Sequence, residues 1–199
     1  MAYSDFDLRT ARESFGLTLV EDVDLFDRVA EVGPGDRLVQ ILEEWAPAAL
    51  AMNTEKARSE MIIAPILMEV VRLSDHRINL FSGIAFDVDR DRGLNGACDY
   101  LIARSPERFY LDRPVIAVVE AKREDIVGGL GQCVAALVAA QTFNARGAGG
   151  PIGPVHGAVT TGNIWRFLRL DGTTAAIDRQ EYHLHQIAKI LGILVDVAA

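Results

Sequence analysis

Apolar and polar residues follow a helical period early in the chain. A turn signal at 34–35 precedes Asp36, a plausible helix N-cap, and apolar residues then recur at intervals of three and four. We therefore expect a short amphipathic helix from this point. Asn53 is a second N-cap candidate, and the helix that it would begin extends to about Leu73. A kink is expected near Pro65, because proline lacks a backbone donor.

From residue 78 the period becomes that of extended chain, which predicts strands. The third strand is apolar on both of its faces, as expected of a central strand that is covered on both sides. The order helix, three strands, helix, two strands, helix is typical of an α/β sandwich built on a mixed sheet. The expected strands cover 78–88, 97–103, 114–121, 155–160 and 164–170, and the later helices cover 127–144 and 181–194.

Acidic residues gather at the N-terminal end. The net charge is -8, and residues 1–55 hold 12 of the 28 acids but 4 of the 20 bases, so residues 56–199 are neutral. We divide the chain into an acidic N-terminal helical arm, 1–52, packed on a core domain, 53–199. A neutral core argues against a broad basic footprint for nucleic acid, although a cleft can concentrate arginines locally.

The composition is that of a chain that can bury a core, with 199 residues of which 50% are hydrophobic. No apolar run approaches the ~20 residues of a membrane span. The N-terminus has acids where a signal peptide would be apolar, so we expect a cytoplasmic protein without membrane contact. Cys98 and Cys133 lie in apolar stretches and fit neither a disulfide framework nor a zinc spacing, which predicts buried free thiols.

The third strand ends in an unusual way, in the sequence VIAVVEAKRE at 115–124. Glu120 and Lys122 are two residues apart, so they should share the sheet face that Ile116 and Val118 bury. A bare acid-x-Lys is a weak signal, because chance alone gives roughly 0.4 occurrences in a chain of this composition. A surface ion pair at a strand end is the alternative reading.

Asp99 stands alone in the apolar strand 97–103. If this strand neighbours 114–121, as sequential strands usually do, Asp99 can lie close to Glu120. Two half-buried carboxylates repel each other unless a positive charge lies between them, and a divalent cation would supply it. A carboxylate that caps a turn is the alternative.

Two more polar residues stand on apolar helix stripes. Glu60 shares its stripe with apolar residues up to Val71, and Gln132 shares its own with alanines and Phe143. A carboxylate and an amide would then face the sheet. The alternatives are an ion pair between Glu60 and a nearby base such as Lys56, and a backbone hydrogen bond for Gln132.

Three other features have ordinary explanations. The glycines of GGLG, 128–131, could cradle a phosphate, but close packing of the helix against the sheet explains them better. His183 and His185 lie two apart in the last expected helix and should point in different directions. Trp165 alternates with Phe167 on a strand and is expected in the core.

Taken in order, a helix with Glu60, a strand with Asp99, a strand with Glu120-Ala121-Lys122 and a helix with Gln132 resemble the PD-(D/E)XK nuclease superfamily. This superfamily includes restriction endonucleases, RecB-type exonucleases and archaeal Holliday-junction resolvases. The match runs from about residue 55 to 170, and the glutamine after the lysine is the RecB-like refinement. The chain is also similar to a group of bacterial proteins with the motifs EKARSE, LNG-x-CDY and VEAK. It departs from the superfamily pattern at Cys98, where proline is usual.

The resemblance implies a restriction-endonuclease-like mixed β-sheet flanked by helices, and a metal-dependent nuclease that hydrolyses phosphodiester bonds, in DNA rather than RNA. Asp99, Glu120 and the Ala121 carbonyl would hold Mg²⁺, with Mn²⁺ as a substitute. Glu60 would bind a second metal or a metal-bound water. Lys122 would orient the attacking water or offset transition-state charge, and Gln132 would position Lys122 or the phosphate.

A second reading comes from a different class of protein. The chain could be a catalytically silent module with a nuclease fold that binds a protein partner in a DNA-processing or defence complex, with the acidic arm as its docking element. A homodimer is open under either reading. The complete set of acids and lysine favours the enzyme, and the neutral core favours the module.

Overall fold

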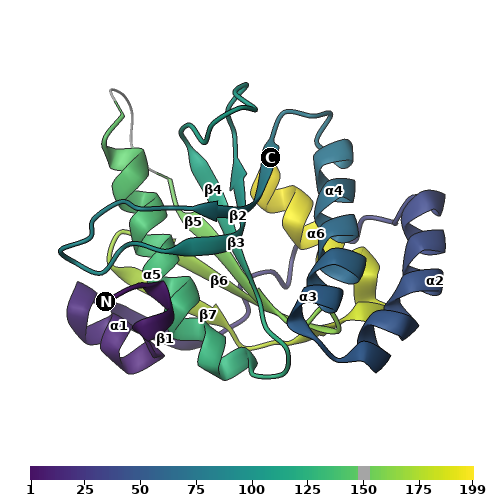
Figure 1. Cartoon of the computed structure of the whole chain (residues 1–199), viewed down its shortest axis with the longest axis horizontal. Coiled ribbons are helices and arrows are strands. Elements are labelled where there is room, and N and C mark those ends of the chain that lie inside the picture. Colours follow the sequence, from purple (N-terminus) through teal and green to yellow (C-terminus); the bar gives the residue numbers. More distant parts are fainter. Residues whose placement is uncertain (148–152) are drawn as a thin grey trace.

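The computed structural model describes residues 1–147 and 153–199. Within these residues the chain forms one open, eight-stranded mixed sheet with helices on both faces (Figure 1), which confirms the α/β class. The strands are β1 (Thr18–Val23), β2 (Asn79–Ala85), β3 (Ala97–Ala103), β4 (Val115–Ala121), β5 (Val155–Thr160), β6 (Ile164–Asp171), β7 (Thr174–Asp178) and β8 (Tyr182–His183). The α-helices are α1 (Leu8–Phe15), α2 (Asp36–Met52), α3 (Glu55–Arg58), α4 (Ala64–Leu73), α5 (Ile126–Ala145) and α6 (Ile187–Ala198), with a π turn η2 (Ser59–Ile63) and 3-10 turns η1 (Tyr3–Asp5) and η3 (Leu184–Gln186).

The sheet order is β1-β7-β6-β5-β4-β3-β2, and β8 pairs with β6 beyond the end of β7. β4 and β5 are parallel, and α5 lies between them in the sequence as a crossover connection, whereas β2, β3 and β4 form an antiparallel meander. All seven residues of β4 are buried, so the expected central strand covered on both sides is confirmed.

Two apolar cores lie on opposite faces of the sheet. Helices α2, α4 and α6 cover one face, and α5 with α1 covers the other, as Figure 1 shows. Trp165 is fully buried in the first core, and Cys98 and Cys133 are buried free thiols in the second, as the sequence predicts. Each apolar face is thus removed from water by its own helical layer.

Three local predictions were wrong. Asn53 does not begin a helix: it ends α2 in the left-handed conformation, with φ of 52°, and Thr54 caps α3 by accepting from the Ala57 N–H. The last helix begins at Ile187 rather than at 181, because β8 pairs with β6 first. His183 therefore lies on a strand, and its ring stacks on that of His185, with ring centroids 5.6 Å apart.

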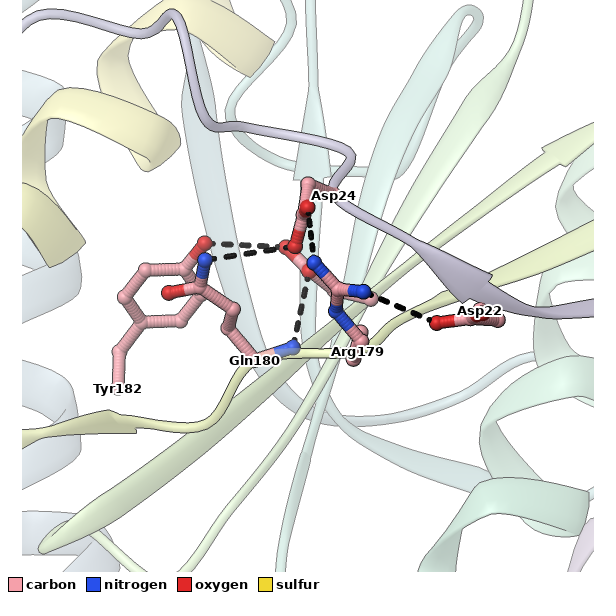
Figure 2. Close-up of polar contacts among 6 residues, drawn as sticks. Asp22, Asp24, Arg179, Gln180 and Tyr182 are labelled. Atoms are coloured by element: carbon pink, nitrogen blue, oxygen red, sulfur yellow. Dashed lines mark hydrogen bonds and ion pairs between the residues drawn. The ribbon is translucent and has the colours of Figure 1, made fainter.

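The N-terminal residues join the sheet rather than forming a wholly helical arm. β1 is an edge strand paired in parallel with β7. Figure 2 shows how the end of β1 and the residue after it are held, with Arg179 donating to Asp22 and Asp24 and Gln180 donating to Asp24. Further along, Lys189 Nζ donates to three backbone carbonyls of the segment between β1 and α2. The acidic end of the chain is therefore a structural part of the sheet.

Helix α5 corrects the expectation that no apolar run approaches membrane-spanning length. By length and composition Ile126–Ala145 could cross a membrane, but 67% of its most apolar stretch is buried inside the protein. The core helix of a soluble protein passes the same test, so α5 is weak evidence for a membrane.

Candidate functional site

The β3–β4 register brings the two expected carboxylates together. Tyr100 pairs with Val119, so the next residues outward, Asp99 and Glu120, face each other across the two strands. The Asp99 Oδ2 atom accepts a hydrogen bond of 2.8 Å from the Ala121 N–H. This places both carboxyl groups at the end of the sheet where β4 leads into α5.

Glu120 is wholly buried, with 0% of its surface exposed. Its Oε2 atom accepts a 2.6 Å hydrogen bond from Gln132 Nε2, and its Oε1 atom accepts none, so its one other polar contact among the described residues is the hydrogen bond with Asp99 that a protonated carboxyl can make. Burial, and then the charge and close contact of Asp99, raise the pKa of Glu120 well above its ordinary value, while Lys122 acts in the opposite direction. An unpaired buried carboxylate oxygen is costly, and it marks a place where a ligand would be favourable.

Gln132 joins the acid to the lysine. The Lys122 ammonium donates a 2.9 Å hydrogen bond to Gln132 Oε1, so a chain of contacts runs from Lys122 through Gln132 to Glu120. Gly129, one turn earlier on α5, leaves the space for the lysine: a Cβ atom there would lie 3.1 Å from Lys122 Cε and 2.7 Å from a Val159 methyl. The expected role of GGLG in close packing is confirmed at this position.

One orientation within β4 differs from expectation. The β3–β4 register shifts between Ile102 and Ala103, which leaves Ile116 in an irregular position. Val118 packs in the core beneath α5, on the face of Glu120, but Ile116 packs in the opposite core. Strict alternation therefore fails at Ile116 and holds from Val118 to the end of the strand.

A cavity of about 160 Å³ opens beside Asp99. Gly83 stands in the middle of β2 with φ of +63°, a conformation that side-chain-bearing residues rarely adopt. Its place between the pairs Ser82–Tyr100 and Ile84–Cys98 puts it opposite Asp99. The residues lining the cavity are Glu55, Lys56, Ser59, Ser82, Gly83, Asp99 and Ala121.

Glu60 does not join this cavity. Its carboxylate lies 2.9 Å from Lys56 Nζ and lines a separate cavity between α2 and α4. The reason is the π turn at 59–63, which precedes Pro65 and changes the direction of side chains relative to an uninterrupted α-helix. Glu55, which stands earlier on α3, lines the cavity instead, and its charge contributes to the raised pKa of Glu120.

A polar network that the sequence did not reveal fixes α3 next to the site. Arg58 Nη1 donates to the Thr161 carbonyl at 2.9 Å, and its Nη2 donates to the Asn53 side chain. Asn53 donates in turn to Glu124, in the link between β4 and α5. The helix that carries Glu55 is thereby tied to the segment that follows Lys122. The left-handed Asn53 could not be recognised as a link from its sequence position alone.

The described residues contain no group of three or more His, Cys, Asp or Glu side chains arranged to hold a metal ion. Asp99 and Glu120 form a pair, with Glu55 across the cavity. The site and fold define a mixed-sheet α/β protein with an acid pair, an amide and a lysine at one end of its sheet. Comparisons with protein-family models, with curated proteins and with solved structures found no match to the chain.

Proposed function

We propose that the chain is a metal-dependent nuclease whose site contains Asp99, Glu120, Lys122 and Gln132. The observation that carries the proposal is the environment of Glu120: a fully buried carboxylate with one unpaired oxygen, in contact with a second carboxylate and linked through Gln132 to a lysine. Most buried side-chain polar atoms have a hydrogen-bond partner, so a buried carboxylate oxygen that accepts no hydrogen bond needs an explanation. Perturbed acids of this kind concentrate at functional sites.

The donors fit Mg²⁺, with Mn²⁺ as its substitute. Mg²⁺ prefers oxygen ligands and is commonly bound through one or two carboxylates with several waters, so a pair of acids suffices. Asp99 and Ala121 line the cavity, and Glu120, which does not line it, lies behind them in contact with Asp99 and has an oxygen that accepts no hydrogen bond. These three residues would hold the ion, and Glu55 takes the place that the sequence gave to Glu60 for a bound water or second ion. The ion would supply Lewis-acid stabilisation of phosphoryl charge.

The chain's own residues would perform the remaining tasks. Lys122 is oriented by Gln132 at the end of β4, where its ammonium can offset negative charge that develops on the phosphate or orient the attacking water. Gln132 holds Glu120 and Lys122 in one arrangement, and hydrolysis would follow in-line attack on the phosphodiester. Lys122 does not line the cavity, so it acts from behind the acid pair.

The order of elements supports a restriction-endonuclease-like core within this proposal. The strands β2 to β6 are neighbours in sequence order, and α5 connects the parallel pair β4 and β5. The acid pair lies on β3 and β4 and the glutamine on the next helix, which is the arrangement of the RecB-like members of the PD-(D/E)XK superfamily. We propose DNA as the substrate and the cytoplasm as the location.

The test is cleavage by the purified chain of single-stranded, duplex and branched DNA in Mg²⁺ and in Mn²⁺, with EDTA as the metal-free control. Lys122→Ala and Asp99→Ala should each abolish cleavage while the circular dichroism spectrum stays unchanged. Arg9→Ala, which removes an exposed ion pair on α1, is the matched control and should remain active. Cleavage that persists in both site variants, or that is absent from the unchanged chain on every substrate, would reject the proposal.

A second candidate function, a silent module that binds a protein, is favoured by one surface feature. In the loop between β3 and β4, Phe109 is 101% exposed and Tyr110 58% exposed. This loop lies at the end of the sheet opposite Asp99 and Glu120, so it would not serve the site. Loss of partner capture in Phe109→Ser with unchanged capture in Lys122→Ala would favour the module.

A further inference from the structure

Among the described residues that line the 160 Å³ cavity, Lys56 alone carries a positive charge. Lys122 is directed to Gln132 and does not line the cavity. The positive charge that an anion entering the cavity would meet therefore comes from α3 and not from the Glu-x-Lys pair of β4. From the sequence, Lys56 is expected only as an ion-pair partner for Glu60.

Glu60 holds Lys56 in place from outside the cavity. The two side chains are 2.9 Å apart at i and i+4, and the pairing raises the pKa of Lys56, so the ammonium stays charged. An ammonium has three donors, so the contact with Glu60 leaves donors for an anion. The π turn that carries Glu60 is itself fixed, because the Tyr100 hydroxyl donates to the Ser59 carbonyl at 2.9 Å.

We propose that Lys56 binds a phosphate of the nucleic-acid backbone at the mouth of this cavity, and that Glu60 is a positioning residue that holds it there. The inference rests on the proposed function, since it takes nucleic acid as the ligand. The cavity volume of about 160 Å³ is below the roughly 300–1,000 Å³ of small-molecule sites, which suits a phosphate group better than a base. A phosphate contact fixes the register of the substrate without reading its sequence.

The first test uses the fact that the chain has three lysines, Lys56, Lys122 and Lys189. Lysine labelled with ¹³C at Cε gives three NMR signals, which single substitutions assign. A short phosphorothioate DNA duplex, which resists hydrolysis, is added to the full chain with Mg²⁺. We expect the chemical shift of the Lys56 signal to change. The Lys189 signal should keep its chemical shift, because the Lys189 ammonium donates to three backbone carbonyls. A bound duplex with an unmoved Lys56 signal, or no binding of the duplex, overturns the inference.

The second test measures duplex binding against salt concentration. The logarithm of the affinity falls linearly with the logarithm of the salt concentration. Lys56→Ala should make this negative slope shallower by about one, because one phosphate contact is lost. Lys56→Arg should restore the slope, and Glu60→Gln should weaken binding while leaving the slope near that of the unchanged chain. The matched control is Arg9→Ala, whose pair with Glu13 has 79% and 57% exposed side chains, against 81% and 61% for Lys56 and Glu60.

An unchanged slope in Lys56→Ala overturns the inference. The two proposals fail separately. If the Lys56 signal shifts and the salt slope changes as expected but the chain cleaves no DNA, the phosphate contact stands and the nuclease proposal fails. If the chain cleaves DNA but Lys56→Ala leaves the salt slope unchanged, the nuclease proposal stands and the phosphate contact fails.

Discussion

Replacing Glu120 by glutamine should stabilise the metal-free chain. The carboxylate is buried, its Oε1 atom is unpaired, and Asp99 is its close neighbour. Glutamine has nearly the same shape, so its oxygen can accept from Gln132 and its amide can donate to Asp99. Removing an unsatisfied buried group gains about 1–3 kcal/mol. For a chain of this length, about 2 kcal/mol raises the melting temperature by about 4–8 °C.

The sign of the pH dependence follows from the raised pKa of Glu120. Between the ordinary pKa and the raised pKa, the folded chain binds this proton and the unfolded chain does not. The stabilising contribution is thus complete below the ordinary value and is lost as the pH rises through the folded value, by at most about 1.36 kcal/mol per pH unit. Glu120→Gln lacks this group, so its advantage over the unchanged chain should grow with pH from near zero in acid.

The assay is urea unfolding in EDTA across a pH series, followed by tryptophan fluorescence. Glu124→Gln is the matched control, because a hydrogen bond from Asn53 lowers the pKa of Glu124 and the exposed carboxylate should help stability rather than harm it. Glu120→Gln should also lose both cleavage and the stabilisation that Mg²⁺ gives the unchanged chain. A Glu120→Gln variant that is less stable than the unchanged chain at pH 8, or a stability difference that is independent of pH, would show that buried Glu120 does not destabilise the fold in this way.

Two further predictions concern α5. Gly129→Ala gains about 1 kcal/mol of helix propensity. Its Cβ atom would meet Val159 and Lys122, and such overpacking costs about 1–3 kcal/mol. We therefore expect a small net loss of stability in urea unfolding and a large loss of cleavage activity. In Gly131→Ala, the added Cβ atom would clash with the backbone of the N-terminal residues. This variant should therefore lose more stability than Arg179→Ala, which removes exposed ion pairs worth about 0–1 kcal/mol. Equal losses in thermal unfolding would contradict the second expectation.

The strands that carry the acid pair could be predicted because their signals are local. Residues 97–103 and 115–121 are apolar runs bounded by polar turns, and both strands have the bounds expected within one residue. Their neighbour relation also follows a general rule, since sequential strands usually pair. β1 was missed because its pairing with β7 joins residues far apart in sequence, and because its sequence, TLVEDV, has exposed acids near its end. β7 was also missed, although it pairs with β6 across a tight turn.

The helix before the sheet shows why the third acid was misplaced. Glu60 falls on an apolar stripe if residues 53–73 form one uninterrupted α-helix, and that assumption fails twice. Asn53 and Thr54 end one helix and begin another, and the π turn at 59–63 alters the phase again. Pro65 predicted a disturbance but not its kind. The sequence pattern gave Glu55 no role in the site, and the structure puts it beside the acid pair.

The charges around the cavity bear on how a nucleic acid could bind at all. Glu55 and Asp99 line it and Glu120 lies behind, while Lys56 is the one positive residue among its described lining. Without a cation this arrangement repels phosphate, because the two acids that line the cavity, Glu55 and Asp99, outnumber its one ammonium. Under the proposed function, a metal ion would offset the repulsion and would be held in part by Glu120, so the metal and the nucleic acid should each strengthen the binding of the other. That coupling would be reciprocal by thermodynamic necessity, and it would allow a chain of net charge -8 to bind a polyanion.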